Sequence, residues 1–142
     1  MTTNFGETAA ETRFHGKHVL GELAASSIVL DDLPLLERVL AETLTDAGAT
    51  VLQVTGKKFE PHGVTVVALL AESHASLHTY PEDELAFFDL FTCGPSADPI
   101  AALKLLVERL LARIITSETI LRGHDCETVS SDNQPADERS LK

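Results

Sequence analysis

Residues 64–94 read VTVVALLAESHASLHTYPEDELAFFDLFTCG, and this stretch decides how the rest of the chain is arranged. It opens with an apolar run at 64–71 and closes with another at 85–91, both rich in residues that favour buried strands. Between them lie two histidines, two serines, a tyrosine and several carboxylates. We therefore expect ionisable groups where apolar strands end, because a rigid scaffold can hold them there and still expose them.

The flanking sequence predicts more strands and two helices. Residues 49–63 begin with strand-like alternation and end in a Pro-His-Gly turn, and residues 18–23 form a short apolar segment. Apolar residues recur at helical spacing over 32–48 and over 98–111, and the second pattern extends to residue 115. This order predicts an α+β fold, a two-layer sandwich with a mainly antiparallel sheet and both helices packed on one face.

The composition excludes several functional classes. The 142 residues are 44% hydrophobic and carry a net charge of −11, which fits one folded domain and argues against binding to nucleic acid or to an anionic membrane. No stretch reaches the roughly 18 apolar residues of a spanning helix. The two cysteines, Cys93 and Cys126, stand in different contexts and do not indicate a disulfide, so we expect a reduced, cytoplasmic protein. Polar, non-periodic ends predict a flexible arm at 1–16 and a disordered acidic tail at 123–142, around one domain at 17–122.

Ser73, His78 and Cys93 are the candidate chemical groups, and each also has a structural interpretation. Ser73 can be a hydrogen-bonded serine at a strand end, and Cys93 a plain buried cysteine. Ser73 and His78 differ by five residues, so an unbroken strand would set them on opposite faces. His74 and His78 would share a face as half of a metal site, but no further ligand stands at a clear spacing, and we predict no metal.

The chain also resembles a known family. Four short segments resemble, in order and spacing, the signature of the prokaryotic S-adenosylmethionine decarboxylase proenzymes: Glu72-Ser73-His74, Leu77-His78-Thr79, Pro81-Glu82 and Phe91-Thr92-Cys93-Gly94. Segments at 18–23, 47–50 and 59–64 are similar as well, so the resemblance spans about residues 17–111.

The resemblance implies a self-processing, pyruvoyl-dependent enzyme. The chain would be cut between Glu72 and Ser73, and Ser73 would become the pyruvoyl cofactor that forms a Schiff base with the substrate's amine. His78 would be the base of processing, and Cys93 would be the proton donor of decarboxylation. Thr65 stands where the family commonly has a serine that assists processing. Cutting the strand would free Ser73 to move toward His78.

The resemblance further implies S-adenosylmethionine as the substrate, with a product that donates aminopropyl groups in spermidine biosynthesis. Phe59 would stack on adenine, Glu82 would accept the ribose hydroxyls, and Tyr80, where the family usually has Trp, would line the adenosyl site. This tyrosine leaves open an alternative substrate, arginine or ornithine. A non-catalytic paralogue should lack one of the three candidate groups, and all three are present. The family also implies a homodimer of cleaved protomers, with two α and two β chains.

Overall fold

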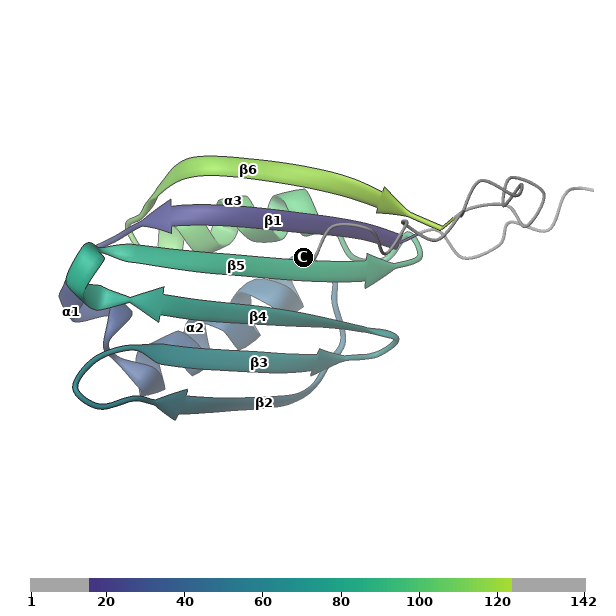
Figure 1. The fold of residues 1–142 in the computed structure, drawn as a ribbon. Helices are drawn as coiled ribbons and strands as arrows, with labels where there is room; N and C mark the ends of the chain where they lie inside the picture. The colour runs from purple at the N-terminus through teal and green to yellow at the C-terminus, as the bar shows by residue number, and fades with distance from the viewer. Residues whose placement is uncertain (1–15, 124–142) are drawn as a thin grey trace, which may run out of the picture.

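The computed structural model describes residues 16–123 and contains one antiparallel sheet with helices against one face (Figure 1). Most of the predicted arm and tail, at 1–15 and 124–142, lies outside the described residues. The strands occur in the order β2-β3-β4-β5-β1-β6. They are β1 (Gly16–Ala24), β2 (Val51–Lys58), β3 (Val64–Leu70), β4 (Ser73–Tyr80), β5 (Leu85–Cys93) and β6 (Arg113–Arg122). The helices are α1 (Ser27–Leu30), α2 (Leu33–Asp46), α3 (Pro99–Arg109) and the short 3₁₀ helix η1 (Pro81–Asp83).

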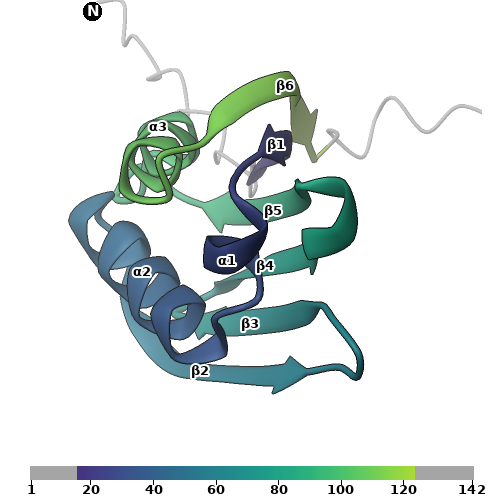
Figure 2. The same cartoon turned by 90° about the vertical axis from the view of Figure 1, so that its left-hand side faces the viewer.

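The two faces of the sheet differ in what covers them. Helices α2 and α3 lie on one side of the sheet, and no described element covers the other side (Figure 2). Alternate strand residues point toward the helices and form the core together with apolar residues of α2 and α3. Core residues of the strands include Val19, Leu23, Val64, Val66, Ala68, Leu70, Ala75, Leu77, Ala86, Phe88 and Leu90. The α+β two-layer prediction is therefore confirmed.

The predicted extension of the second helix to residue 115 is wrong. Helix α3 ends at Arg109, and Leu111 has a φ of 51°, a left-handed conformation that a helix does not continue through. Residues 113–122 form β6 and pair with β1, so their apolar residues extend the sheet. Backbone pairing with a strand that is distant in sequence overrides the local helical spacing here.

Thr79 is a buried polar residue that ties three segments together. Its side chain is 1% exposed. The hydroxyl accepts a hydrogen bond from the Val64 N–H at 2.9 Å and donates one to the Leu30 carbonyl at 2.7 Å. This end of β3 and β4 is therefore bonded to α1, with no buried partner left unsatisfied.

We predict that Thr79→Val lowers the free energy of unfolding by about 1–3 kcal/mol, because the isosteric valine leaves a buried N–H and a buried carbonyl without their partner. Thr116→Val, at an exposed position of β6, should change it by less than about 0.5 kcal/mol. Urea unfolding of both variants measures the difference. Equal free energies of unfolding for Thr79→Val and Thr116→Val would show that the hydrogen bonds of the Thr79 hydroxyl make no net contribution to stability.

Candidate active site

Three side chains gather around His78 at one end of the uncovered face, and we term the four residues the histidine cluster: Phe59, Thr65, His78 and Tyr80. Thr65 and His78 are paired across β3 and β4, and Thr65 Oγ1 and His78 Nδ1 share a hydrogen bond of 2.6 Å. The Tyr80 ring stands edge-on to the His78 ring at 4.7 Å between centroids, and the Phe59 ring lies 6.3 Å away.

The sheet fixes the position of His78. Its backbone is paired with Thr65 on one side and Phe87 on the other, so the residue cannot shift along the sheet. The bond to Thr65 sets the plane of the ring and leaves the other ring nitrogen free to exchange a proton. Tyr80 also meets the Phe87 ring at 5.7 Å, so aromatic rings continue from Phe59 in the β2–β3 turn to strands β4 and β5.

Glu72, Ser73 and Cys93 lie at the other end of the sheet, and we term them the cleavage cluster. Leu70 and Ser73 are paired, so the β3–β4 turn contains only two residues, Ala71 and Glu72. His74 pairs with Phe91, and extending this register by one residue sets Ser73 beside the strand end that carries Cys93. Cys93 is a free, half-buried cysteine.

Glu72 has a backbone conformation that few residues other than glycine adopt. Its φ is 63°, in the left-handed region, which costs an L-residue with a Cβ of the order of 1–2 kcal/mol. Ser73 Oγ donates to the Ala71 carbonyl at 3.3 Å. The strain therefore sits on the residue whose carbonyl the serine would attack, directly beside that serine.

The structure does not bring Ser73 and His78 together within one chain. β4 is a regular strand, and five residues of strand span about 16 Å. Their side chains start on opposite faces, as the odd spacing predicts. Because ladder hydrogen bonds hold β4 from His74 onward on both sides, freeing the chain end at position 73 would not close this distance. The two clusters lie at opposite ends of the sheet (Figure 1).

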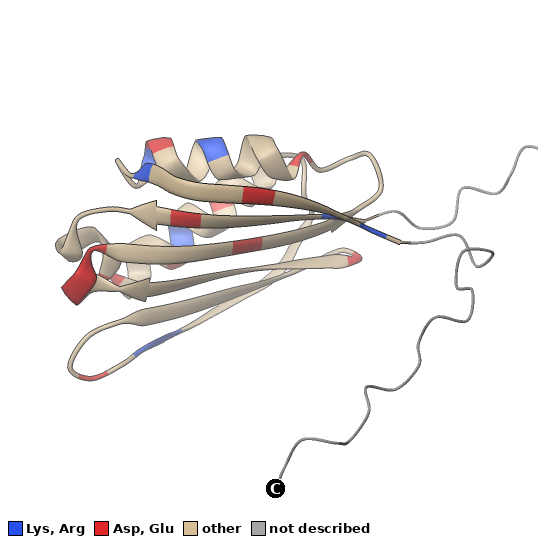
Figure 3. Ribbon diagram, turned by 45° about the horizontal axis from the view of Figure 1, so that its top comes forward, with Lys and Arg blue, Asp and Glu red and all other residues tan. Residues whose placement is uncertain are grey.

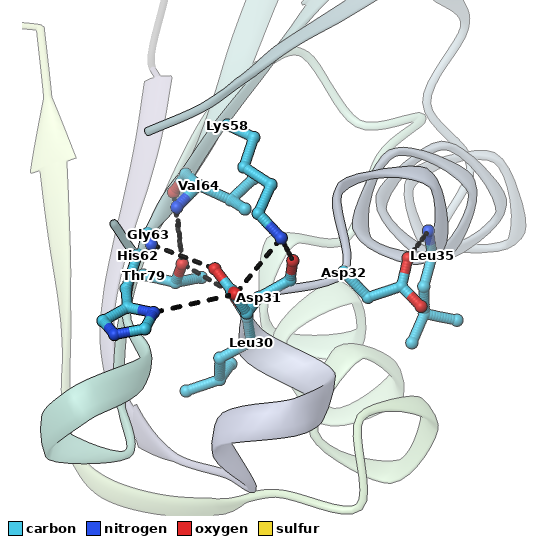
Figure 4. A network of polar contacts seen from close by, with 9 residues as sticks. All are labelled: Leu30, Asp31, Asp32, Leu35, Lys58, His62, Gly63, Val64 and Thr79. Atoms are coloured by element: carbon cyan, nitrogen blue, oxygen red, sulfur yellow. Dashed lines mark hydrogen bonds and ion pairs between the residues drawn. The ribbon is translucent and has the colours of Figure 1, made fainter. Parts of the chain in front are cut away.

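Glu82 lies at the same end of the sheet as the histidine cluster, but it lines a separate cavity. It lies in η1, just after Tyr80, and borders a cavity of about 790 Å³ together with Asp31, Lys58 and His62. The pKa of Asp31 is lowered from its ordinary value, chiefly by the hydrogen bond from the Gly63 backbone and then by Lys58 (Figure 4). Asp31 is not predicted from the sequence, because its contacts span 27 or more positions and leave no local signal.

The remaining polar residues of the uncovered face form no metal cluster. Within residues 16–123, no three His, Cys, Asp or Glu side chains are arranged to hold a metal ion. The His74 ring faces the Phe91 ring at 5.8 Å. Acidic residues lie on three neighbouring strands, β5, β1 and β6 (Figure 3). The Arg122 guanidinium lies over the Phe91 ring, 5.1 Å from its centroid.

Among the helices of residues 16–123, none has the length and apolar character needed to cross a membrane.

Known proteins are similar to this chain in sequence and in fold. The family described as S-adenosylmethionine decarboxylase matches residues 17–123. An S-adenosylmethionine decarboxylase proenzyme 2 of Bacillus cereus is 41% identical over 109 residues, covering 76% of this chain and 89% of the relative. A proenzyme of Acetivibrio thermocellus is 38% identical over 109 residues, covering 76% and 88%. The crystal structure of the adenosylmethionine decarboxylase from Aquifex aeolicus superposes with a TM-score of 0.66 at 26% identity, covering 92% of this chain and all of that one. The chain therefore belongs to the S-adenosylmethionine decarboxylase family.

Proposed function

We propose that this chain is a self-processing, pyruvoyl-dependent decarboxylase of S-adenosylmethionine. The observation that carries the proposal is the Glu72-Ser73 junction, where Glu72, a non-glycine residue in the left-handed conformation, ends a two-residue turn directly before Ser73. Family membership supports the reaction class, and the relatives are named proenzymes. The decarboxylated product would serve as the aminopropyl donor of spermidine biosynthesis.

Maturation would begin with attack of Ser73 Oγ on the Glu72 carbonyl, which exchanges the peptide bond for an ester and relieves the strain at Glu72. A base then removes the α-proton of residue 73, and elimination releases residues 1–72 with a carboxylate at Glu72. The unsaturated residue left at position 73 takes up one water and loses ammonia, which leaves a pyruvoyl group. His78, oriented by Thr65, is suited to the role of that base.

In turnover, the pyruvoyl group would supply a carbonyl that takes up the substrate's amine and accepts the electrons of the breaking carbon–carbon bond. Cys93 extends from the strand beside position 73 and would return a proton to the α-carbon. The Phe59 and Tyr80 rings offer flat surfaces for adenine, and the Glu82 carboxylate can accept two ribose hydroxyls. Cys93 is a free thiol, as this role requires, and a reducing cytoplasm would keep it so.

The separation of the two clusters supports a homodimer. A two-fold axis through the middle of the uncovered face would set the cleavage cluster of one protomer against the histidine cluster of its partner, and symmetry would generate the second site. We propose such a dimer of cleaved protomers, with two α and two β chains. Position 73 of each protomer would then lie across the interface from His78 of the other, and Ser73 would have to turn from the helix-covered face to meet that base.

The exposed apolar residues of the uncovered face support the same arrangement. Val67 is 42% exposed, Leu69 52% and Tyr80 40%, and each alternates with core residues of its strand, so all three lie on the uncovered face. Exposed apolar residues on a sheet face that no described element covers are typical of an interaction site. Packing two such faces together would bury these side chains and exclude water from both sites.

We predict self-cleavage between Glu72 and Ser73, giving chains 1–72 and 73–142, the second blocked by pyruvoyl. Ser73→Ala should stay whole because it lacks the nucleophile, whereas Ser76→Ala, on the same strand, should be cut normally. Intact-mass measurement distinguishes the products. A single uncut wild-type chain with full activity would refute the mechanism.

The dimer makes a separate prediction about mixed protomers. Ser73→Ala and His78→Ala should each remain uncut when expressed alone. Coexpressed, they can form one competent site, in which an intact Ser73 faces an intact His78 from the other protomer. Mass analysis should then show cleavage of the His78→Ala chain only. If that chain remains whole in purified mixed dimers, the base comes from elsewhere.

The substrate is tested by measuring CO₂ release from S-adenosylmethionine, arginine and ornithine side by side. We expect kcat/KM for S-adenosylmethionine to exceed the others by about 10²-fold or more, since adenosine contacts worth about 2.7 kcal/mol would be lost with an amino acid alone. Tyr80→Trp should preserve this preference because either ring can stack. Faster turnover of arginine or ornithine would favour the alternative substrate class.

A further inference from the structure

The turn between β2 and β3, residues 59–63, carries the Phe59 ring and has a constrained shape. The Phe59 N–H donates to the Gly63 carbonyl at 2.8 Å and closes the turn. Gly63 has a φ of 105°, and a Cβ there would approach the Thr79 carbonyl oxygen to 3.2 Å. These features define the turn itself. They do not define how the turn is oriented relative to the sheet and to His78.

Asp31, at the end of α1, holds the turn from outside. Its Oδ1 accepts the Gly63 N–H at 3.1 Å, and its Oδ2 lies 3.1 Å from Lys58 Nζ (Figure 4). Lys58 also donates to the Asp31 carbonyl at 2.9 Å. Lys58 ends β2 and Gly63 ends the turn, so one carboxylate contacts the chain on both sides of Phe59. His62 Nδ1 approaches the same carboxylate at 4.0 Å.

The core in turn anchors Asp31. The preceding residue, Leu30, is fully buried, and its carbonyl accepts the buried hydroxyl of Thr79. Thr79 lies on β4 directly after His78, so the hold on the turn and the histidine cluster share one rigid strand. A displacement of Asp31 would therefore need a change in the core, whereas loss of its carboxylate would release the turn alone.

We propose that Asp31 is a positioning residue that orients the Phe59 ring for the adenosine part of the substrate; the proposal rests on the function proposed above. The Phe59 side chain is 41% exposed, and its ring makes only a distant approach to His78. Its orientation therefore depends on the turn. Without the Asp31 carboxylate the turn gains conformational freedom, which substrate binding must then remove. Position 73 and Cys93, the groups proposed for the chemical step, lie on segments that make no contact with Asp31 in one chain, so loss of the Asp31 carboxylate leaves their own contacts unchanged.

The test compares Asp31→Ala and Asp31→Asn with the matched control Asp32→Asn. Asp32 is the neighbouring acid, and its side chain accepts the Leu35 N–H at the start of α2, a capping role that asparagine fills equally well. For each processed protein we would measure the cleaved fraction, the thermal midpoint, and KM and kcat per titrated pyruvoyl group. Calorimetry with 5′-methylthioadenosine, which lacks the amino-acid part, gives a readout independent of activity.

We expect Asp31→Ala to raise both KM and the Kd of methylthioadenosine about tenfold, which corresponds to about 1.4 kcal/mol, with kcat changed less than about twofold. Asp31→Asn should raise them less, because its amide oxygen still accepts the Gly63 N–H although the charge facing Lys58 is lost. Asp32→Asn should match the wild type. Should Asp31→Ala fail to fold, Asp31→Asn and Lys58→Met must each still raise the Kd at unchanged kcat.

Lower thermal midpoints with unchanged KM and Kd in the Asp31 variants would assign Asp31 to stability alone and overturn the inference. A fall in kcat equal to the rise in KM would overturn it too, because the residue would then act on the chemical step. The wild-type protein separates this result from a failure of the proposed function. If wild type neither decarboxylates S-adenosylmethionine nor binds methylthioadenosine, both proposals fail. If it does both, the Asp31 variants test this inference only.

Discussion

Strand β4 is bonded to a neighbour on each side from His74 to His78, and the geometry of the candidate site depends on this double pairing. It aligns His78 with Thr65 at hydrogen-bond distance and keeps Ala75 and Leu77 in the core. The same pairing keeps the strand regular, so the start of β4 and His78 stay about five strand positions apart. A rigid strand thus keeps the histidine cluster and the cleavage cluster apart within one chain, and the dimer proposed above would bring them together.

The same constraint explains why the strain at Glu72 persists. A two-residue turn between two paired strands has few available conformations, because the Leu70–Ser73 pair holds both its ends. Glycine would adopt the left-handed conformation without cost, but this chain has glutamate there. Acyl transfer to Ser73 would remove the planar peptide bond and let the turn relax, so part of the cost of cleavage would already be present in the uncut fold.

The sequence predicts the layers and the chemical groups better than it predicts their distances. The apolar runs at 64–71 and 85–91 appear as β3 and β5 because period-2 burial leaves a clear pattern. The second helix was predicted to extend to residue 115 because the helical spacing of apolar residues continues that far, and pairing of residues 113–122 with β1 decides the outcome. The odd separation of Ser73 and His78 is visible in the sequence. Its consequence for a single chain requires knowing that β4 is regular throughout.

Asp31 shows how a group outside the site can act as a permanent support. Its pKa in the folded protein is lowered, first by the Gly63 N–H and then by Lys58. A lowered carboxyl pKa stabilises the fold above the unfolded-state value, and this contribution is lost only as the pH falls through the lowered value. Near neutral pH the carboxylate is therefore always charged. Its hold on the turn is constant under working conditions, which suits a residue that positions Phe59 and excludes a role as a pH switch.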